Sequence, residues 1–155
     1  MVYDTPAALR TALEARLQNE ARDRALPLDR LRRRAVFERV LVRLDLAQPG
    51  TWVVKGGVAL EIRWQERART TRDLDLARRE AAADGERLRV VLIDLLGTDP
   101  DGDGFTFEVG SPTQLAADEA GRSGWRYAIV SRLAGREFAA IRVDIVSRAE
   151  EIVEV

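Results

Sequence analysis

The amino-acid sequence predicts an α+β domain in which a mixed β-sheet is flanked by helices. Three observations support this fold class. Leucines recur at helical spacing in residues 1–50, short strands with period-two patterning then alternate with helical segments, and two long apolar strands close the chain. Because 155 residues fit one core, we expect a single domain over 1–155, with helices in 1–50 and the sheet in 51–155.

Each N-terminal helix has a recognisable start. Thr5-Pro6 combines an N-cap with a proline at the first helical position, so the first helix is expected to begin there. The second helix is expected to follow Pro27, with Asp29 as its cap, and to run to about Ala47. The apolar stripe of this second helix consists of Leu31, Ala35, Val40, Leu41 and Leu44.

The remaining elements alternate. Strands are expected at 52–54, 73–77, 105–109, 125–133 and 138–146, and helices at 58–65 and 84–96. The last two strands form a hairpin around residues 134–137, and the long loop 110–124 is typical of a mobile segment. In the final strand, alternation places the following residues on one face: Phe138, Ala140, Arg142, Asp144 and Val146.

The composition narrows the chemistry. The chain contains neither cysteine nor histidine, which excludes disulfides, zinc thiolate sites and Ser-His-Asp catalysis. Carboxylates and hydroxyls remain as metal ligands, and they suit Mg²⁺, Mn²⁺ or Ca²⁺. The formal net charge of −1 argues against a strongly basic nucleic-acid binder. Because the sequence has neither a bilayer-spanning run nor a signal-peptide pattern, we expect a cytoplasmic protein with no membrane partner.

A glycine pair follows the strand at 52–54. Gly56 and Gly57 lead from this strand toward a helix, and such a turn presents backbone N–H groups to an anion. Lys55, the one lysine among 25 basic residues, precedes the pair. Strand–glycine–helix turns are also common without any ligand, so this feature alone is weak.

Two acidic residues alternate with leucines on the strand at 73–77. Residues i and i+2 of a strand point the same way, so Asp73 and Asp75 emerge together while Leu74 and Leu76 enter the core. Carboxylates this close repel each other, and a divalent cation between them would relieve the repulsion. The alternatives are a solvated acidic edge strand, or pairing with two basic residues of the preceding loop, Arg69 and Arg72.

A third acidic residue, Asp144, lies in a strongly apolar strand, where a charge is costly unless it is paired. Arg142 on the same face is one candidate partner. The other interpretation is that Asp144 faces the Asp73 and Asp75 pair and completes a site for two metal ions. Two such ions stabilise both the attacking and the leaving oxygen of an in-line phosphoryl displacement.

The order strand, Gly-Gly, helix, Asp-x-Asp and a later Asp resembles the polymerase-beta type nucleotidyltransferase superfamily. More narrowly, K-G-G-x-A-L at 55–60 and R-x-T-x-D-L-D-L at 69–76 resemble the AbiEii/AbiGii-type toxins of type IV toxin–antitoxin systems. The resemblance covers about residues 28–80 and resumes at 138–146. It implies a nucleotidyltransferase-type mixed sheet, with the catalytic part in 51–155.

The resemblance also implies roles for individual residues. Asp73 and Asp75 would coordinate Mg²⁺ or Mn²⁺, and Asp144 would complete the second metal and orient or deprotonate the acceptor hydroxyl. The triphosphate of an NTP substrate would lie against the glycine pair, and basic side chains would neutralise its charge. The residues implied for nucleotide binding are Gly56, Gly57, Lys55, Arg69 and Arg72.

For the whole protein, the resemblance implies a toxin that transfers a nucleotide from an NTP to RNA, expected at the tRNA 3′ end. This transfer would inhibit translation until a cognate antitoxin neutralises the toxin. Two alternatives stay open: a transferase that modifies a protein, and a degenerate nucleotidyltransferase-fold module that binds without catalysis. Val58 replaces the hydroxyl residue that often follows the glycine pair in the family. Family members usually continue with a basic helical C-terminal half, whereas this chain ends at Val155, as expected of a fragment, a short form or half of a split protein.

Three further patterns have less weight. Residues 99–104 imitate the start of a calcium loop, but Gly110 occupies the place of the bidentate glutamate, so a solvated turn is expected. The arginines that begin the second helix are candidates for RNA phosphate contacts, although a solvated helix face is favoured; they are Arg30, Arg32, Arg33 and Arg34. The tryptophans Trp52, Trp64 and Trp125 are candidates for base stacking, but core packing is favoured for Trp52.

Overall fold

The computed structural model describes residues 5–55, 73–79, 84–116 and 124–147. These residues form three helices and a six-stranded mixed sheet, which confirms the predicted α+β class. The elements are α1 (Pro6–Arg24), α2 (Leu28–Ala47), β1 (Trp52–Lys55), β2 (Asp73–Arg78), α4 (Gly85–Leu96), β3 (Phe105–Val109), β4 (Thr113–Gln114), β5 (Gly124–Leu133) and β6 (Arg136–Ser147). The predicted helix at 58–65 lies outside the described residues. Among the described helices, none is long and apolar enough to cross a membrane.

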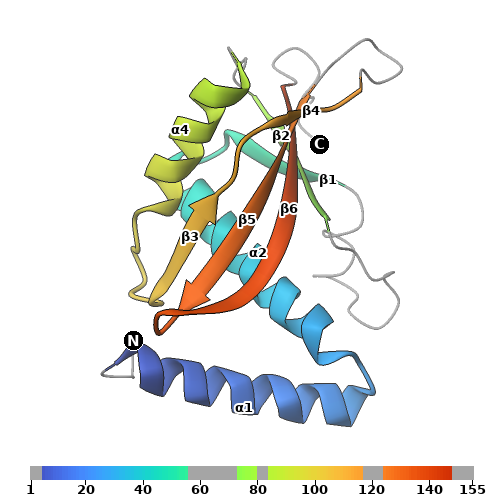
Figure 1. Ribbon diagram of the computed structural model, residues 1–155, viewed down its shortest axis with the longest axis vertical. Coiled ribbons are helices and arrows are strands. Elements are labelled where there is room, and N and C mark those ends of the chain that lie inside the picture. The colour runs from blue at the N-terminus through green and yellow to red at the C-terminus, as the bar shows by residue number, and fades with distance from the viewer. Residues whose placement is uncertain (1–4, 56–72, 80–83, 117–123, 148–155) are drawn as a thin grey trace.

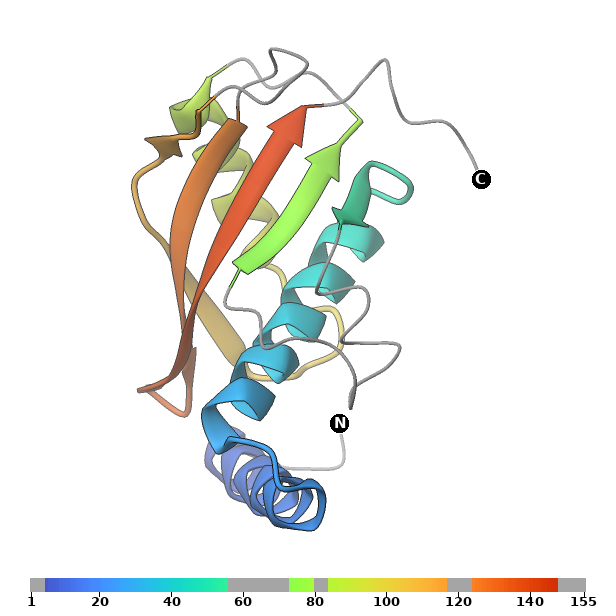
Figure 2. The same ribbon diagram turned by 90° about the vertical axis from the view of Figure 1, so that its right-hand side faces the viewer.

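The sheet has the strand order β1-β2-β6-β5-β3, and β4 pairs with β5 off this path. β2 and β6 are parallel, whereas the other neighbouring strands are antiparallel. In Figure 1, α2 passes behind the sheet with α4 beside it, and these helices contact β6 and β3 respectively. α1 lies across the end of the sheet where β5 turns into β6, which the second view also shows (Figure 2). The helices therefore cover one face and one end of the sheet.

The covered face of the sheet forms the core. Leu74 and Leu76 of β2 are fully buried, as their alternation with acidic residues predicts. Val143 of β6 and Ile129 of β5 extend this apolar layer, and residues of α2 such as Val40 pack in the same cluster. β2, β5 and β6 thus direct most of their apolar side chains toward the helices, which leaves most of their charged side chains on the other face.

The two helix starts differ from each other. Thr5 caps α1 as predicted, because its Oγ1 accepts a hydrogen bond of 3.1 Å from the N–H of Ala8. The predicted cap Asp29 is wrong. α2 begins at Leu28 with Pro27 in extended backbone before it and no side-chain cap, so Asp29 already lies in the first turn. There it pairs with Arg32.

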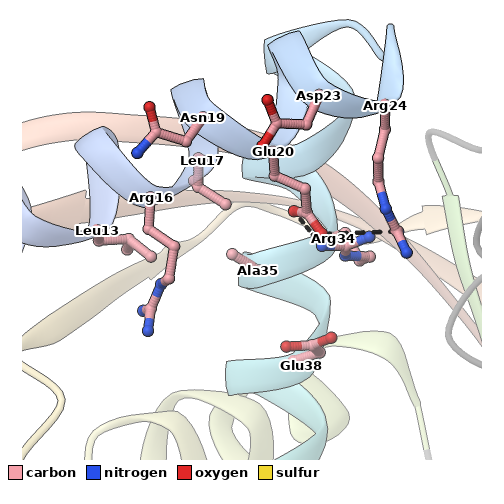
Figure 3. A pocket seen from close by; sticks show the side chains of 10 residues that line it. All are labelled: Leu13, Arg16, Leu17, Asn19, Glu20, Asp23, Arg24, Arg34, Ala35 and Glu38. Atoms are coloured by element: carbon pink, nitrogen blue, oxygen red, sulfur yellow. Dashed lines mark hydrogen bonds and ion pairs between the residues drawn. The ribbon is translucent and has the colours of Figure 1, made fainter.

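The arginines at the start of α2 do not form a solvated face, so that expectation is wrong. Arg32 donates to both carboxylate oxygens of Glu14, at 3.0 and 2.7 Å, and Arg34 donates to Glu20 at 2.7 Å. Figure 3 shows Glu20 against Arg34 in the hollow of about 600 Å³ between α1 and α2. Arg30 is buried. Arg32 and Arg34 therefore join the two helices and are committed to protein carboxylates instead of RNA phosphates.

The hairpin between β5 and β6 is confirmed, with a turn of two residues. Ala134 and Gly135 both have positive φ, at 56° and 75°, as the two-residue turns that match strand twist require. Arg10 of α1 donates to the carbonyl oxygens of Leu133, Arg136 and Glu137 at 2.8 to 3.0 Å. This arginine fastens the first helix to the tip of the last hairpin.

Phe138 does not lie on the predicted face of β6. The pairing of β5 with β6 shifts between Ser131, which pairs with Ala139, and Arg132, which pairs with Glu137. Phe138 is therefore an extra residue, and it is buried in the core. The Ser131 hydroxyl accepts from the N–H of Ala139 at 3.0 Å and donates to its carbonyl at 2.7 Å, so it satisfies the backbone next to the bulge.

The turn at 99–104 is exposed over residues 99–102, as expected of a solvated turn, but Asp103 anchors it in the core. Asp103 is buried and accepts a hydrogen bond of 2.5 Å from Arg43 of α2. Asp99 accepts from the N–H groups of Asp103 and Gly104 at 2.8 and 2.9 Å. Burial alone would raise the pKa of Asp99, but these two N–H groups and the charge of Arg43 bring it below its usual value. Asp99 and Asp103, two of the carboxylates that imitate a calcium loop, thus bind groups of the protein itself.

The long loop at 110–124 contains β4, a short strand that the sequence did not predict. Trp52 packs against the core as favoured, and its Nε1 donates to Gln48 at 3.0 Å. Trp125 packs against Gly85 at the start of α4, on the covered side of the sheet, so it does not face the acidic residues as a stacking platform would. Trp64 lies outside the described residues.

Arg43 is the most deeply buried charge of the described core, with 2% of its surface exposed. Besides Asp103, it donates to the carbonyls of Leu96 and Phe105. Arg43→Ala should lower the free energy of unfolding by about 3–5 kcal/mol, because it leaves a buried carboxylate without its main partner. Urea unfolding at neutral pH measures this loss.

The matched control is Arg39→Ala on the same helix, which removes a more exposed ion pair with Asp101 at 3.0 Å and a longer contact of 3.7 Å with Asp103, but leaves the bond from Arg43 to Asp103 in place. This change should cost less than about 1 kcal/mol. Equal losses from the two variants would contradict the structural role given to Arg43.

Candidate active site

The parallel pairing of β2 with β6 brings the predicted acidic residues together. Asp75 is the register partner of Asp144, and Asp73 is the partner of Arg142. Side chains of paired residues point to the same face of a sheet. Because Leu74 and Leu76 face the core, the three carboxylates share the face that the described helices leave uncovered.

Two arginines hold these carboxylates. Arg126 of β5 is the register partner of Asp144 and donates to both of its oxygens, from Nε at 2.8 Å and from Nη2 at 2.9 Å. Arg142 donates from Nε to Asp73 at 2.7 Å. Nη2 of Arg126 also lies 4.0 Å from an oxygen of Asp73. Two guanidinium groups and the acidic side chains thus form one charged cluster.

Of the two interpretations of Asp144, pairing with Arg142 is not the one that the structure shows, because the arginine that holds Asp144 is Arg126. Asp144 and Arg142 are two apart on one strand, so their Cα atoms are separated by about 7 Å, whereas a residue directly opposite on the antiparallel neighbour lies closer. Arg126 occupies that opposite position. Counting back from the hairpin turn without the bulge would place Arg126 opposite Val143. The bulge moves the pairing by one residue, and the alternation pattern of the two strands does not reveal it.

The electrostatics agree with a shared cluster. The hydrogen bond to Asp144 raises the pKa of Arg126, and the charges of Asp144, Asp73 and Asp75 raise it further. Asp75 therefore acts on the same guanidinium as the other two acids. The Asp144 side chain is 14% exposed, compared with 30% for Asp73, so the pair formed by Asp144 and Arg126 is the more sheltered one.

A metal ion would have to compete with these ion pairs. In the part of the chain that the structure describes, no group of three or more Asp, Glu, His or Cys side chains is gathered as a metal site. The chemistry of the donors nevertheless fits a hard divalent cation, because carboxylate oxygens from two adjacent strands are the available ligands. A bound metal would therefore share Asp73 and Asp144 with these arginines or replace them.

The other predicted site residues fall around the same place or outside the described ranges. Lys55 ends β1, where its backbone is the register partner of Asp75. Asp73 begins β2. Lys55 and Asp73, the described residues on either side of 56–72, therefore both lie at the acidic residues. Four residues implied for nucleotide binding lie outside the described ranges: Gly56, Gly57, Arg69 and Arg72.

Comparison with known proteins identifies the family of this chain. The model of the family described as "Nucleotidyl transferase AbiEii toxin, Type IV TA system" matches residues 37–154. The match covers about three quarters of the chain and includes every described strand, so the chain belongs to this family. α1 and the first part of α2 precede the matched region. None of the curated proteins matches the sequence.

The position of Arg126 depends on how closely β5 approaches β6 at its start. A Cβ atom on Gly124 would lie 2.5 Å from the carbonyl oxygen of Ile145, which is too close for any side chain. Gly124→Ala should therefore push the start of β5 away from Asp144 and lower the stability by about 1–3 kcal/mol. Urea unfolding measures the loss.

Gly110→Ala is the graded control, because its Cβ would meet the carbonyl oxygen of Ala128 at 3.2 Å, a contact that a small shift relieves. A larger loss from Gly110→Ala than from Gly124→Ala would contradict the proposed close approach.

Proposed function

We propose that this chain transfers a nucleotide from an NTP to RNA, with the tRNA 3′ end as the expected acceptor, using divalent metal held by Asp73, Asp75 and Asp144. The observation that supports the proposal is the register of β2 and β6, which sets Asp75 beside Asp144 on an uncovered sheet face. Membership of a nucleotidyl transferase toxin family supplies the reaction class.

In this proposal the carboxylates have different roles. Asp73 and Asp75 would hold both metal ions, and Asp144 would hold the second and would orient the acceptor hydroxyl or accept its proton. Bound Mg²⁺ or Mn²⁺ supplies positive charge that stabilises the charge developing on the phosphoryl oxygens. Lys55, together with the glycine pair at 56–57, holds the triphosphate.

Arginine supplies the remaining positive charge in this proposal. Arg69 and Arg72 bind nucleotide phosphates, as guanidinium forks match phosphate oxygens. The acceptor RNA approaches over the uncovered face of the sheet. Modification of tRNA would inhibit translation in the cytoplasm, and a cognate antitoxin would neutralise the chain, as the toxin–antitoxin family indicates.

A labelled-transfer assay tests the proposal. The protein is incubated with each labelled NTP, Mg²⁺ and total tRNA, beside Asp73→Asn, Asp75→Asn and Asp144→Asn. Each variant keeps the shape of the side chain and removes its charge, so transfer to tRNA should fall by about 100-fold or more. Omission of Mg²⁺ should abolish transfer.

Asp94→Asn is the matched control, since Asp94 is an exposed acid on α4, which contacts the far side of the sheet. It should transfer at the wild-type rate. Label found on protein instead of tRNA would indicate a protein acceptor. Nucleotide binding without any transfer would indicate a binding module. Either result contradicts RNA transfer by this chain.

A further inference from the structure

We propose that Arg126 is an internal counter-ion that occupies Asp144 in the metal-free chain and must be displaced before Asp144 binds a divalent metal. This inference rests on the proposed function, because it concerns the same carboxylates. It assigns a role to a residue of β5 that the sequence motifs do not include.

The first argument is the geometry of the pair. Arg126 donates to both Asp144 oxygens, from Nε at 2.8 Å and Nη2 at 2.9 Å. This two-pronged arrangement covers the edge of the carboxylate with positive charge. A divalent cation on the same edge would meet the guanidinium at short range, where two positive charges repel strongly.

The second argument is the reach of the same guanidinium toward β2. Its Nη2 lies 4.0 Å from an oxygen of Asp73, so the group extends from the acid of one strand toward the acid of the next. A cation shared between these strands would occupy the same region. Arg126 therefore neutralises in the metal-free chain the charge that metal would neutralise in the loaded site.

The third argument is the difference between the two arginines. Arg142 makes one hydrogen bond to Asp73 and is the more exposed of the two. Arg126 makes two hydrogen bonds to the more sheltered acid. Of the two pairs, the one between Arg126 and Asp144 is therefore the stronger competitor with metal.

Metal binding measured without turnover tests the inference. Mn²⁺ alone is titrated into wild type, Arg126→Met and Arg126→Lys, and bound Mn²⁺ is followed by electron paramagnetic resonance. Arg126→Met should bind Mn²⁺ about three- to tenfold more tightly than wild type, because the competing pair is gone. Arg126→Lys keeps the charge but loses the planar fork, so its affinity should lie between the two.

The matched control is Arg132→Met. Arg132 lies on the same strand and has a similarly exposed side chain. Its Nε lies 2.6 Å from Glu108 Oε1, and this pair is separate from the three aspartates. It should bind Mn²⁺ as wild type does. Circular dichroism identifies the folded variants, and Arg126→Lys carries the test if Arg126→Met does not fold.

The outcomes separate the inference from the proposed function. If Asp144→Asn abolishes Mn²⁺ binding but neither Arg126 variant tightens it, the metal site stands and the counter-ion role is wrong. If Arg126→Lys matches wild type while Arg126→Met tightens binding, general charge and not the pairing is responsible, which also overturns the inference. If Asp144→Asn leaves Mn²⁺ binding unchanged, the proposed metal site is itself wrong.

Discussion

The parallel pairing of β2 with β6 is the constraint on which the site depends. The face of the sheet that the helices cover fixes the register of this pairing, because Leu74, Leu76 and Val143 are fully buried there. A slip of one residue would expose these apolar side chains and turn the acids into the core, at a cost of several kcal/mol. The hydrophobic face of the sheet therefore positions Asp75 beside Asp144, although no apolar residue takes part in the chemistry.

Local periodicity in the sequence predicts which strand residues are buried, and local motifs predict where helices begin. The burial of Leu74 beside a partly exposed Asp75 follows from the two-residue repeat of a strand, and the start of α1 follows from Thr5 and its proline. The partner of Asp144 could not be found in this way. It depends on the pairing between strands, and one extra residue, Phe138, changes the count along the hairpin. A solvated face for the arginines of α2 was the wrong expectation, because their carboxylate partners Glu14 and Glu20 lie on α1.

Guanidinium–carboxylate pairs recur through the molecule, and burial separates their functions. Arg43 and Asp103 are both almost fully enclosed, so neither is open to exchange with solvent or a ligand, and the pair contributes to the fold. Arg126 is about one third exposed and can reach solvent and ligands. The same chemistry thus gives a permanent link in the core and an exchangeable one on the open face. Nearly all basic residues of this chain are arginine, so the two pairs do not differ in the type of cation. They differ in burial.

The fastening of α1 to the hairpin tip has a consequence for the order of folding. Arg10 contacts the carbonyl of Glu137, 127 positions away in the sequence, and its guanidinium also lies over the ring of Phe138. Contacts between such distant positions close the largest loops and form slowly. The acceptors of Arg10 are carbonyls of the turn, which point together only once β5 and β6 have paired. α1 is synthesised before β5 and β6, yet it docks on their hairpin only after the two strands have paired.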